Sequence, residues 1–85
     1  MDENGIGYAL GRSVRAQRRR LGLTQEELGE KADVHWTFIG HIERGRKLPS
    51  LRVLTNIAGA LGTTPAQLLC GVAARAPRAE SWKRP

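Results

Sequence analysis

The sequence has few of the features that cross-link a secreted protein or anchor a membrane protein. Its 85 residues include one cysteine, Cys70, which excludes an intramolecular disulfide framework and a cysteine-rich zinc site and suits a reducing cytoplasm. No apolar run approaches the roughly 20 residues that span a bilayer, and residues 1–4 are acidic and polar where a signal peptide would be basic and then apolar. We therefore expect one small cytoplasmic domain with no membrane partner, whose core is compact and helical or externally supported.

The chain also lacks the groups from which an enzyme site is built. Cys70, His35, His41 and a scattered set of acids offer no spaced nucleophile, base and orienting group, no phosphate loop and no metal set. The two histidines stand six positions apart and do not share a helical face, which argues against a metal pair. We expect no enzymatic activity, no cofactor, no metal and no small-molecule substrate.

Acidic residues are few, and the basic ones are segregated. Lys and Arg number 14 against 8 Asp and Glu, a formal net charge of +6 that a polyanion partner would select. The first basic cluster comprises Arg12, Arg15, Arg18, Arg19 and Arg20, the second comprises Arg44, Arg46, Lys47 and Arg52, and between them lie Glu26, Glu27, Glu30 and Asp33. This segregation predicts a positive face, as phosphate contacts require.

Apolar spacing and capping signals divide residues 6–70 into five short helices. A capping box at Thr24 and Glu27 starts the second helix after a first over about residues 6–20, and Asp33 allows a tight turn after the second. Ser50 caps the fourth helix, and Thr64, followed by proline, starts the fifth. The apolar sides are expected at Ile6, Leu10, Val14 and Leu21 in the first helix, Leu28 and Ala32 in the second, Val34, Phe38, Ile39 and Ile42 in the third, and Leu51, Leu54, Ile57, Ala58 and Leu61 in the fourth.

The third predicted helix is distinguished by the residues on its exposed side. Trp36, Thr37, Gly40 and His41 point away from its apolar stripe, and an exposed basic loop follows at residues 46–49. Residues 71–85 have no sustained amphipathic period and are predicted to form a flexible basic tail. Trp82 in this tail is either a simple exposed aromatic or an anchor on a partner subunit.

Two segments carry a resemblance to a known family. They read LGLTQEEL at residues 21–28 and IGHIERGRKLPSL at residues 39–51. With the helix pattern around them, they resemble the phage repressor and Cro family of helix-turn-helix proteins, the xenobiotic-response-element family, which includes restriction-modification controller proteins. The resemblance covers about residues 10–69 and implies an all-α, compact five-helix domain of the lambda-repressor-like DNA-binding type over residues 6–70.

The resemblance implies roles for individual residues. The recognition helix, at about residues 35–43, would enter the major groove and contact bases through Trp36, Thr37, His41 and His35. Phosphate contacts are implied for Gln25, Arg18, Arg44, Arg46, Lys47 and Arg19. Structural roles are implied for Glu43, as the partner of Arg18, for Gly29 at a close helix crossing, and for Ile39 and Ile42 in the core. Asp33 and Gly40 depart from the Gly and Ser that the family often has there.

The function implied is that of a sequence-specific transcriptional regulator of double-stranded DNA, cytoplasmic and associated with the nucleoid. It would act as a homodimer on a palindromic operator, with an interface on exposed apolar surface around Leu61 to Leu69, or with a partner protein. An antitoxin or a protein-interaction adaptor with the same fold remains the alternative, because fold alone does not determine function. A restriction-modification controller, an antitoxin and a phage-type regulator all fit.

Overall fold

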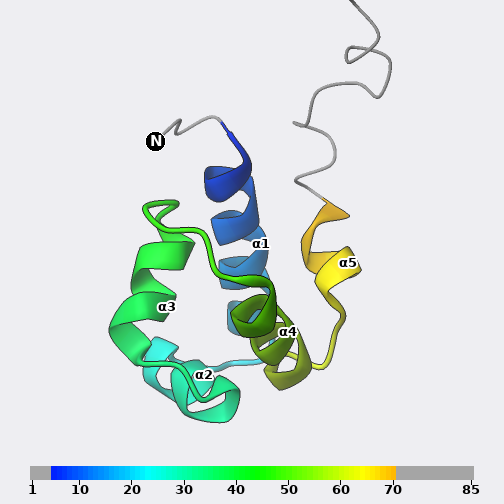
Figure 1. Ribbon diagram of the computed structural model, residues 1–85. Coiled ribbons are helices and arrows are strands. Elements are labelled where there is room, and N and C mark those ends of the chain that lie inside the picture. The colour runs from blue at the N-terminus through cyan, green and yellow to red at the C-terminus, as the bar shows by residue number, and fades with distance from the viewer. Residues whose placement is uncertain (1–4, 71–85) are drawn as a thin grey trace, which may run out of the picture.

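The computed structural model describes residues 5–70, which fold into five α-helices without a strand (Figure 1). The helices are α1 (Ile6–Arg20), α2 (Gln25–Ala32), α3 (Trp36–Glu43), α4 (Leu51–Ala60) and α5 (Pro65–Leu68). The predicted fold class and helix order are confirmed. Within this range no helix is long and apolar enough to cross a membrane. The expected tail, with Trp82, lies outside the described residues and stays a prediction.

The capping signals in the sequence fall where the helices begin. Thr24 Oγ1 accepts a hydrogen bond from the Glu27 amide at 3.0 Å, and the Glu27 carboxylate accepts one from the Thr24 amide at 2.8 Å. Asp33 ends α2 in the left-handed conformation with φ of 58°, which an aspartate adopts more readily than most residues. The turn between α2 and α3 is therefore as short as the sequence predicts.

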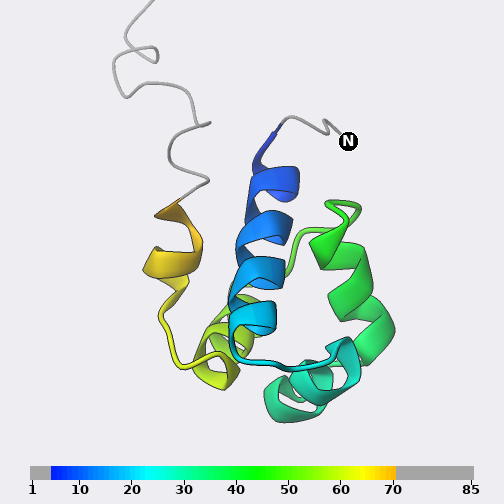
Figure 2. The same ribbon diagram turned by 180° about the vertical axis from the view of Figure 1, so that it is seen from behind.

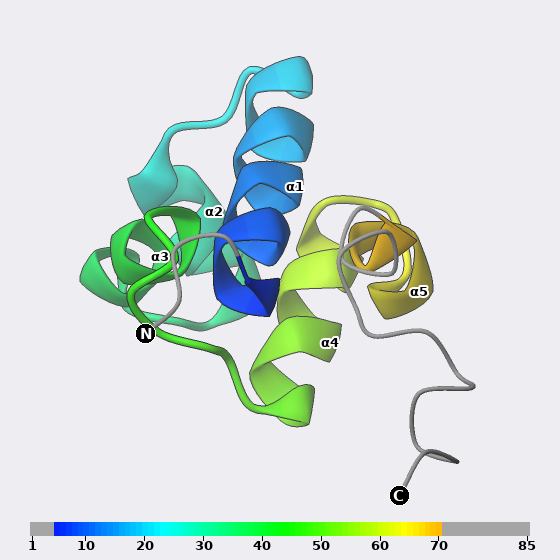
Figure 3. The ribbon, with the colours of Figure 1, turned by 90° about the horizontal axis from the view of Figure 1, so that it is seen from above.

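Helix α1 stands in the middle of the domain, with α2 and α3 on one side and α4 and α5 on the other (Figures 2 and 3). Helix α3 packs on both α1 and α2, and α2 also packs on α4. All five helices contribute to one buried core, whose members are Ala9, Leu10, Val14, Leu28, Ala32, Ile39, Ile42, Leu54, Ile57, Ala58, Leu61 and Leu68. Because the core reaches α3 from two sides, the helix is held at a fixed angle.

Three residues predicted to be buried are exposed, and all three lie at helix ends. Ile6 is the first residue of α1, Leu21 follows its last residue, and Leu51 is the first residue of α4 with 75% of its surface exposed. The helices extend past the core at these points, so correct helical spacing does not bring the side chain inside. The apolar sides predicted here were wrong for these residues.

The expected dimer surface also needs correction. Leu61 and Leu68 are each no more than 2% exposed, because they close the core between α4 and α5. Two leucines at the limits of the 61–69 stretch are therefore used within the domain itself, and the prediction that this stretch presents them on an exposed apolar surface was wrong. Among the leucines of this stretch, Leu69 alone is half-buried, at the edge of the core.

Candidate nucleic-acid interface

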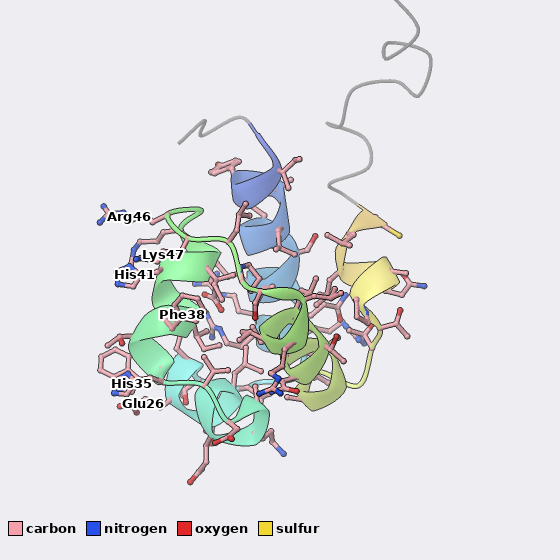
Figure 4. All side chains as sticks on the ribbon, in the orientation of Figure 1. Glu26, His35, Phe38, His41, Arg46 and Lys47 are labelled. Carbon is pink, nitrogen blue, oxygen red and sulfur yellow. The ribbon has the colours of Figure 1, made fainter. Side chains whose placement is uncertain are left out.

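Helix α3 has one buried side and one exposed side. Ile39 and Ile42 are fully buried in the core, as the sequence predicts for the residues that hold this helix. Trp36 is 45% exposed and Thr37 is exposed beside it in the first turn. The side chain of His41 lies on the same outer side of α3, away from α4 (Figure 4).

The basic loop after α3 continues this outer side. Arg46 and Lys47 are exposed, and their side chains lie beyond His41 on the same side of the domain (Figure 4). At the opposite end of α3, Glu26 lies near His35 and marks where the charge changes sign. The face is therefore basic toward the C-terminal end of α3 and mixed toward its beginning.

His35 is the N-cap of α3, and its ring is held in place before any ligand binds. Its Nδ1 accepts a hydrogen bond from the Thr37 amide at 3.2 Å and lies 2.7 Å from Thr37 Oγ1. The ring also stacks on Trp36, with centroids 5.9 Å apart. With Nδ1 as the acceptor, the neutral ring carries its proton on Nε2, which is left as a donor. The Thr37 hydroxyl can still accept a hydrogen bond while it donates to Nδ1, but it must leave Nδ1 to donate to another partner.

Gly40 faces away from the apolar stripe of α3, as predicted, but it is buried, which the sequence does not predict. A Cβ at this position would stand 3.2 Å from Arg44 Nη1 and 3.5 Å from Gln25 Oε1. The guanidinium of Arg44 and the carboxamide of Gln25 therefore cover the helix here. Arg44 Nη2 also lies 3.4 Å from His41 Nδ1, so the missing side chain allows three polar groups from two helices to gather at one point.

Glu43 organises a charged network between three helices. Arg18 Nε donates to Glu43 Oε2 at 2.6 Å and Arg18 Nη2 donates to Oε1 at 3.0 Å, the bidentate pair expected from the resemblance. Arg18 Nη1 donates to the Leu23 carbonyl at 2.8 Å. Gln25 Nε2 donates to Glu43 Oε1 at 3.0 Å, a contact that sequence reasoning missed. The network therefore orients Gln25 from α2, Arg18 from α1 and Glu43 from α3.

This network is shielded from water. Only 3% of the Glu43 side chain and 11% of the Arg18 side chain are exposed, and theirs is the one ion pair within residues 5–70. The hydrogen bond to Glu43 raises the pKa of the Arg18 guanidinium and the Glu43 charge adds to this, while burial acts in the opposite direction. Each of the three guanidinium nitrogens donates one of the hydrogen bonds in this network, and Nη1 and Nη2 each carry a second N–H group.

Two glycines let the helices approach closely enough to aim α3. A Cβ on Gly29 would stand 2.5 Å from the Val34 carbonyl oxygen, which agrees with the close crossing predicted there. A Cβ on Gly11 would stand 2.6 Å from the Glu43 carbonyl oxygen and closer still to that of Ile42. Sequence reasoning missed Gly11, although its place on the buried side of α1, one residue after Leu10, was a usable signal.

Arg19 is a phosphate candidate that the structure places near Arg44 but apart from the basic loop at residues 46–49. It is exposed on α1, on a side of the domain where it shares a cleft with Arg44 and not with Arg46 or Lys47. Within residues 5–70 no three His, Cys, Asp or Glu side chains are grouped as metal ligands. The described residues around α3 therefore supply hydrogen-bonding groups and positive charge.

Comparison with known proteins supports this interpretation. Residues 9–69 match the helix-turn-helix domain family. The control protein C.BamHI of Bacillus amyloliquefaciens is 39% identical over 67 residues, which cover 78% of this chain and 83% of that protein. The immunity repressor protein of Bacillus phage phi105 is 43% identical over 53 residues, which cover 62% of this chain but only 37% of the repressor.

A solved structure of a related protein points to the same family. The restriction-modification controller protein C.AhdI from Aeromonas hydrophila aligns with a TM-score of 0.69 and 32% identity, covering 71% of this chain and 91% of that one. The phage repressor and controller resemblance is thus confirmed at the level of sequence and of fold. These relatives are regulators and not enzymes. The chain belongs to the helix-turn-helix domain family of DNA-binding transcriptional regulators.

Proposed function

We propose that this protein binds a specific double-stranded DNA operator by placing α3 in the major groove. The observation that carries the proposal is the division of α3 into a fully buried side at Ile39 and Ile42 and a polar, protruding side. A helix of 8 residues is about 12 Å long, and the major groove is about 12 Å wide. The core on one side of α3 makes the other side rigid enough to read bases.

The base contacts are assigned to the exposed side of α3 and its cap. Thr37 would donate to or accept from a base edge, or place its methyl group against thymine, and His41 would bind guanine acceptors. Trp36, half exposed, would lie on sugar or thymine methyl surface. His35 would present Nε2, which is left as a donor while Nδ1 accepts from the Thr37 amide, to a base or a phosphate.

The phosphate contacts are assigned to groups around α3. Gln25 is the first residue of α2, so its amide lies at the positive end of a helix while Glu43 orients its side chain. Arg44, Arg46 and Lys47 would bind backbone on the C-terminal side of α3. Arg18, which Glu43 holds in place, would turn its remaining N–H groups toward the DNA backbone. These groups would hold the protein in register without selecting a sequence.

The relatives also support a proposal for the biological role. Similarity to a control protein and to a restriction-modification controller favours a controller of this kind, with a phage-type repressor as the second candidate. Such a regulator would act in the cytoplasm as a dimer, with two recognition helices meeting half-sites about 34 Å apart. Because Leu61 and Leu68 are buried, an interface in this stretch would use its other residues, such as Leu69 at the edge of the core. Sedimentation at high concentration, with and without DNA, tests it, and monomer alone in both would refute it.

The test of DNA binding is selection of bound duplexes from a random pool at two salt concentrations. We expect a palindromic motif with half-sites one helical turn apart. Thr37→Ala should relax the motif at one position, whereas Thr55→Ala, an exposed threonine on α4 whose hydroxyl binds the Leu51 carbonyl, should select the same motif as the parent chain. A pool that remains unselected would refute the proposal and favour a protein-interaction adaptor or an antitoxin that acts through a protein partner.

A further inference from the structure

A cleft between α1 and the end of α3 has no role in the function proposed so far. It measures about 530 Å³ and lies between α1 and the C-terminal end of α3. We name it the arginine cleft, and its lining consists of Tyr8, Arg12, Arg15, Ala16, Arg19, Glu43 and Arg44. Four of these seven residues are arginines that come from two different helices.

The positive charge in the arginine cleft is not neutralised by the protein. Glu43 is the one acid in the lining, and its carboxylate already accepts hydrogen bonds from Arg18 and Gln25. No other ion pair occurs within residues 5–70. Arg12, Arg15 and Arg19 are also exposed, so they contribute little to the core. Like charges gathered without a structural purpose indicate a negatively charged ligand.

The linear arrangement of the arginines on α1 indicates a row of phosphates and not a single anion as the ligand. Arg12, Arg15 and Arg19 follow one another on one side of α1, and the seven helical steps from Arg12 to Arg19 span about 10 Å along the helix axis. Arg12 is held by the Tyr8 hydroxyl at 3.3 Å and by the Tyr8 ring. Guanidinium groups bind phosphate oxygens in a bidentate manner.

The arginine cleft begins where the outer side of α3 ends. Arg44 lines the cleft and also lies 3.4 Å from His41 on α3. A DNA strand bound at His41 and Arg44 would therefore continue toward Arg15 and Arg19. We propose that the arginine cleft binds backbone phosphates of the DNA that flanks the base pairs read by α3. The inference rests on the proposed operator binding and extends its footprint beyond the bases that are read.

The test is a scan of the selected operator with single methylphosphonate groups, each of which removes one phosphate charge. Binding is measured by fluorescence anisotropy for the parent chain, Arg15→Gln and Arg20→Gln. Arg20 is the matched control, because it lies on the same helix outside the arginine cleft and donates to Gln17. Both arginines are exposed, so both variants should keep the parent helicity and melting temperature.

We expect the parent chain to lose affinity when certain phosphates outside the selected base pairs are neutralised. In Arg15→Gln the same neutralisation should have no further effect, since two groups in contact do not add. Arg15→Gln should also lower the salt slope by about 0.9, so that raising salt from 50 to 200 mM costs about three- to fourfold less affinity. Arg20→Gln should behave as the parent chain.

Two results would overturn the inference while leaving the proposed function intact. One is selection of a clear operator together with the same phosphate profile and salt slope for Arg15→Gln and Arg20→Gln. The other is binding of free tripolyphosphate that Arg15→Gln abolishes, with no flanking phosphate affected, which would assign the arginine cleft to a free anion. If the parent chain selects no duplex, the proposed function itself fails.

Discussion

Replacing Glu43 by leucine should test whether the buried charged network holds the three helices together. The Glu43 carboxylate accepts three hydrogen bonds, two from Arg18 and one from Gln25. Leucine has a similar volume but accepts none. The substitution therefore leaves the Arg18 guanidinium, in a side chain only 11% exposed, with the Leu23 carbonyl as its one remaining partner.

The expected loss follows from that burial. Breaking a buried pair by removing one partner costs about 3 to 5 kcal/mol, and we take about 3 because Arg18 keeps some exposure and one hydrogen bond. In a domain of this size each kcal/mol lowers the melting temperature by about 4 to 8 °C, so Glu43→Leu should melt about 12 to 24 °C below the parent chain. Urea unfolding followed by circular dichroism should give the same loss with an unchanged m-value.

The double variant Arg18→Met with Glu43→Leu is the control. It removes both charges but also the partners of the Gln25 amide and the Leu23 carbonyl, so it should recover much of the loss and lie within about 1 to 2 kcal/mol of the parent chain. Two results would refute the reasoning. Either Glu43→Leu costs less than about 1 kcal/mol, or the double variant is as unstable as the sum of Glu43→Leu and Arg18→Met alone.

Three further predictions concern other parts of the structure. Gly11→Ala should cost about 1 to 3 kcal/mol in urea unfolding because its Cβ would overlap backbone carbonyls of α3, whereas Gly59→Ala, with open space at its Cβ, should gain up to about 1 kcal/mol. Leu51→Ser should change stability by less than about 0.5 kcal/mol, and a larger loss would contradict its exposure. In operator titrations, Arg44→Ala should weaken binding to every duplex and lower the salt slope by about 0.9, whereas Thr37→Ala should cost about 1 to 3 kcal/mol at one base pair; equal behaviour would contradict their separate roles.

The helices were predictable because their signals are local. Thr24, Ser50 and Thr64 each accept a hydrogen bond from the amide three residues later, and Asp33 takes the left-handed conformation between α2 and α3. Each of these interactions lies within a few residues of sequence, so reading the chain in short windows finds it. The order and number of helices then follow from the apolar spacing.

Burial at the helix ends was not predictable in this way. Leu51 and Leu61 lie on the same apolar side of α4 by their spacing, yet one is exposed and the other is buried. The difference depends on where α4 crosses the neighbouring helices. A short stretch of sequence within α4 carries no information about that crossing. The same holds for Gly40, whose burial comes from the side chains of Arg44 and Gln25 and not from its position on α3.

The candidate site depends both on local sequence signals and on packing between helices. As a result, some of its residues position α3 and others would contact DNA. Helix α3 has 8 residues, too few to be stable alone, so its direction must come from the packing of Ile39 and Ile42 and from the Glu43 network. The side chains that would read DNA contribute little to that packing, since Thr37 is exposed and Trp36 is half exposed. Changing the exposed residues should therefore alter which operator is read at little cost in stability, whereas changing the buried ones should weaken binding to every operator at once.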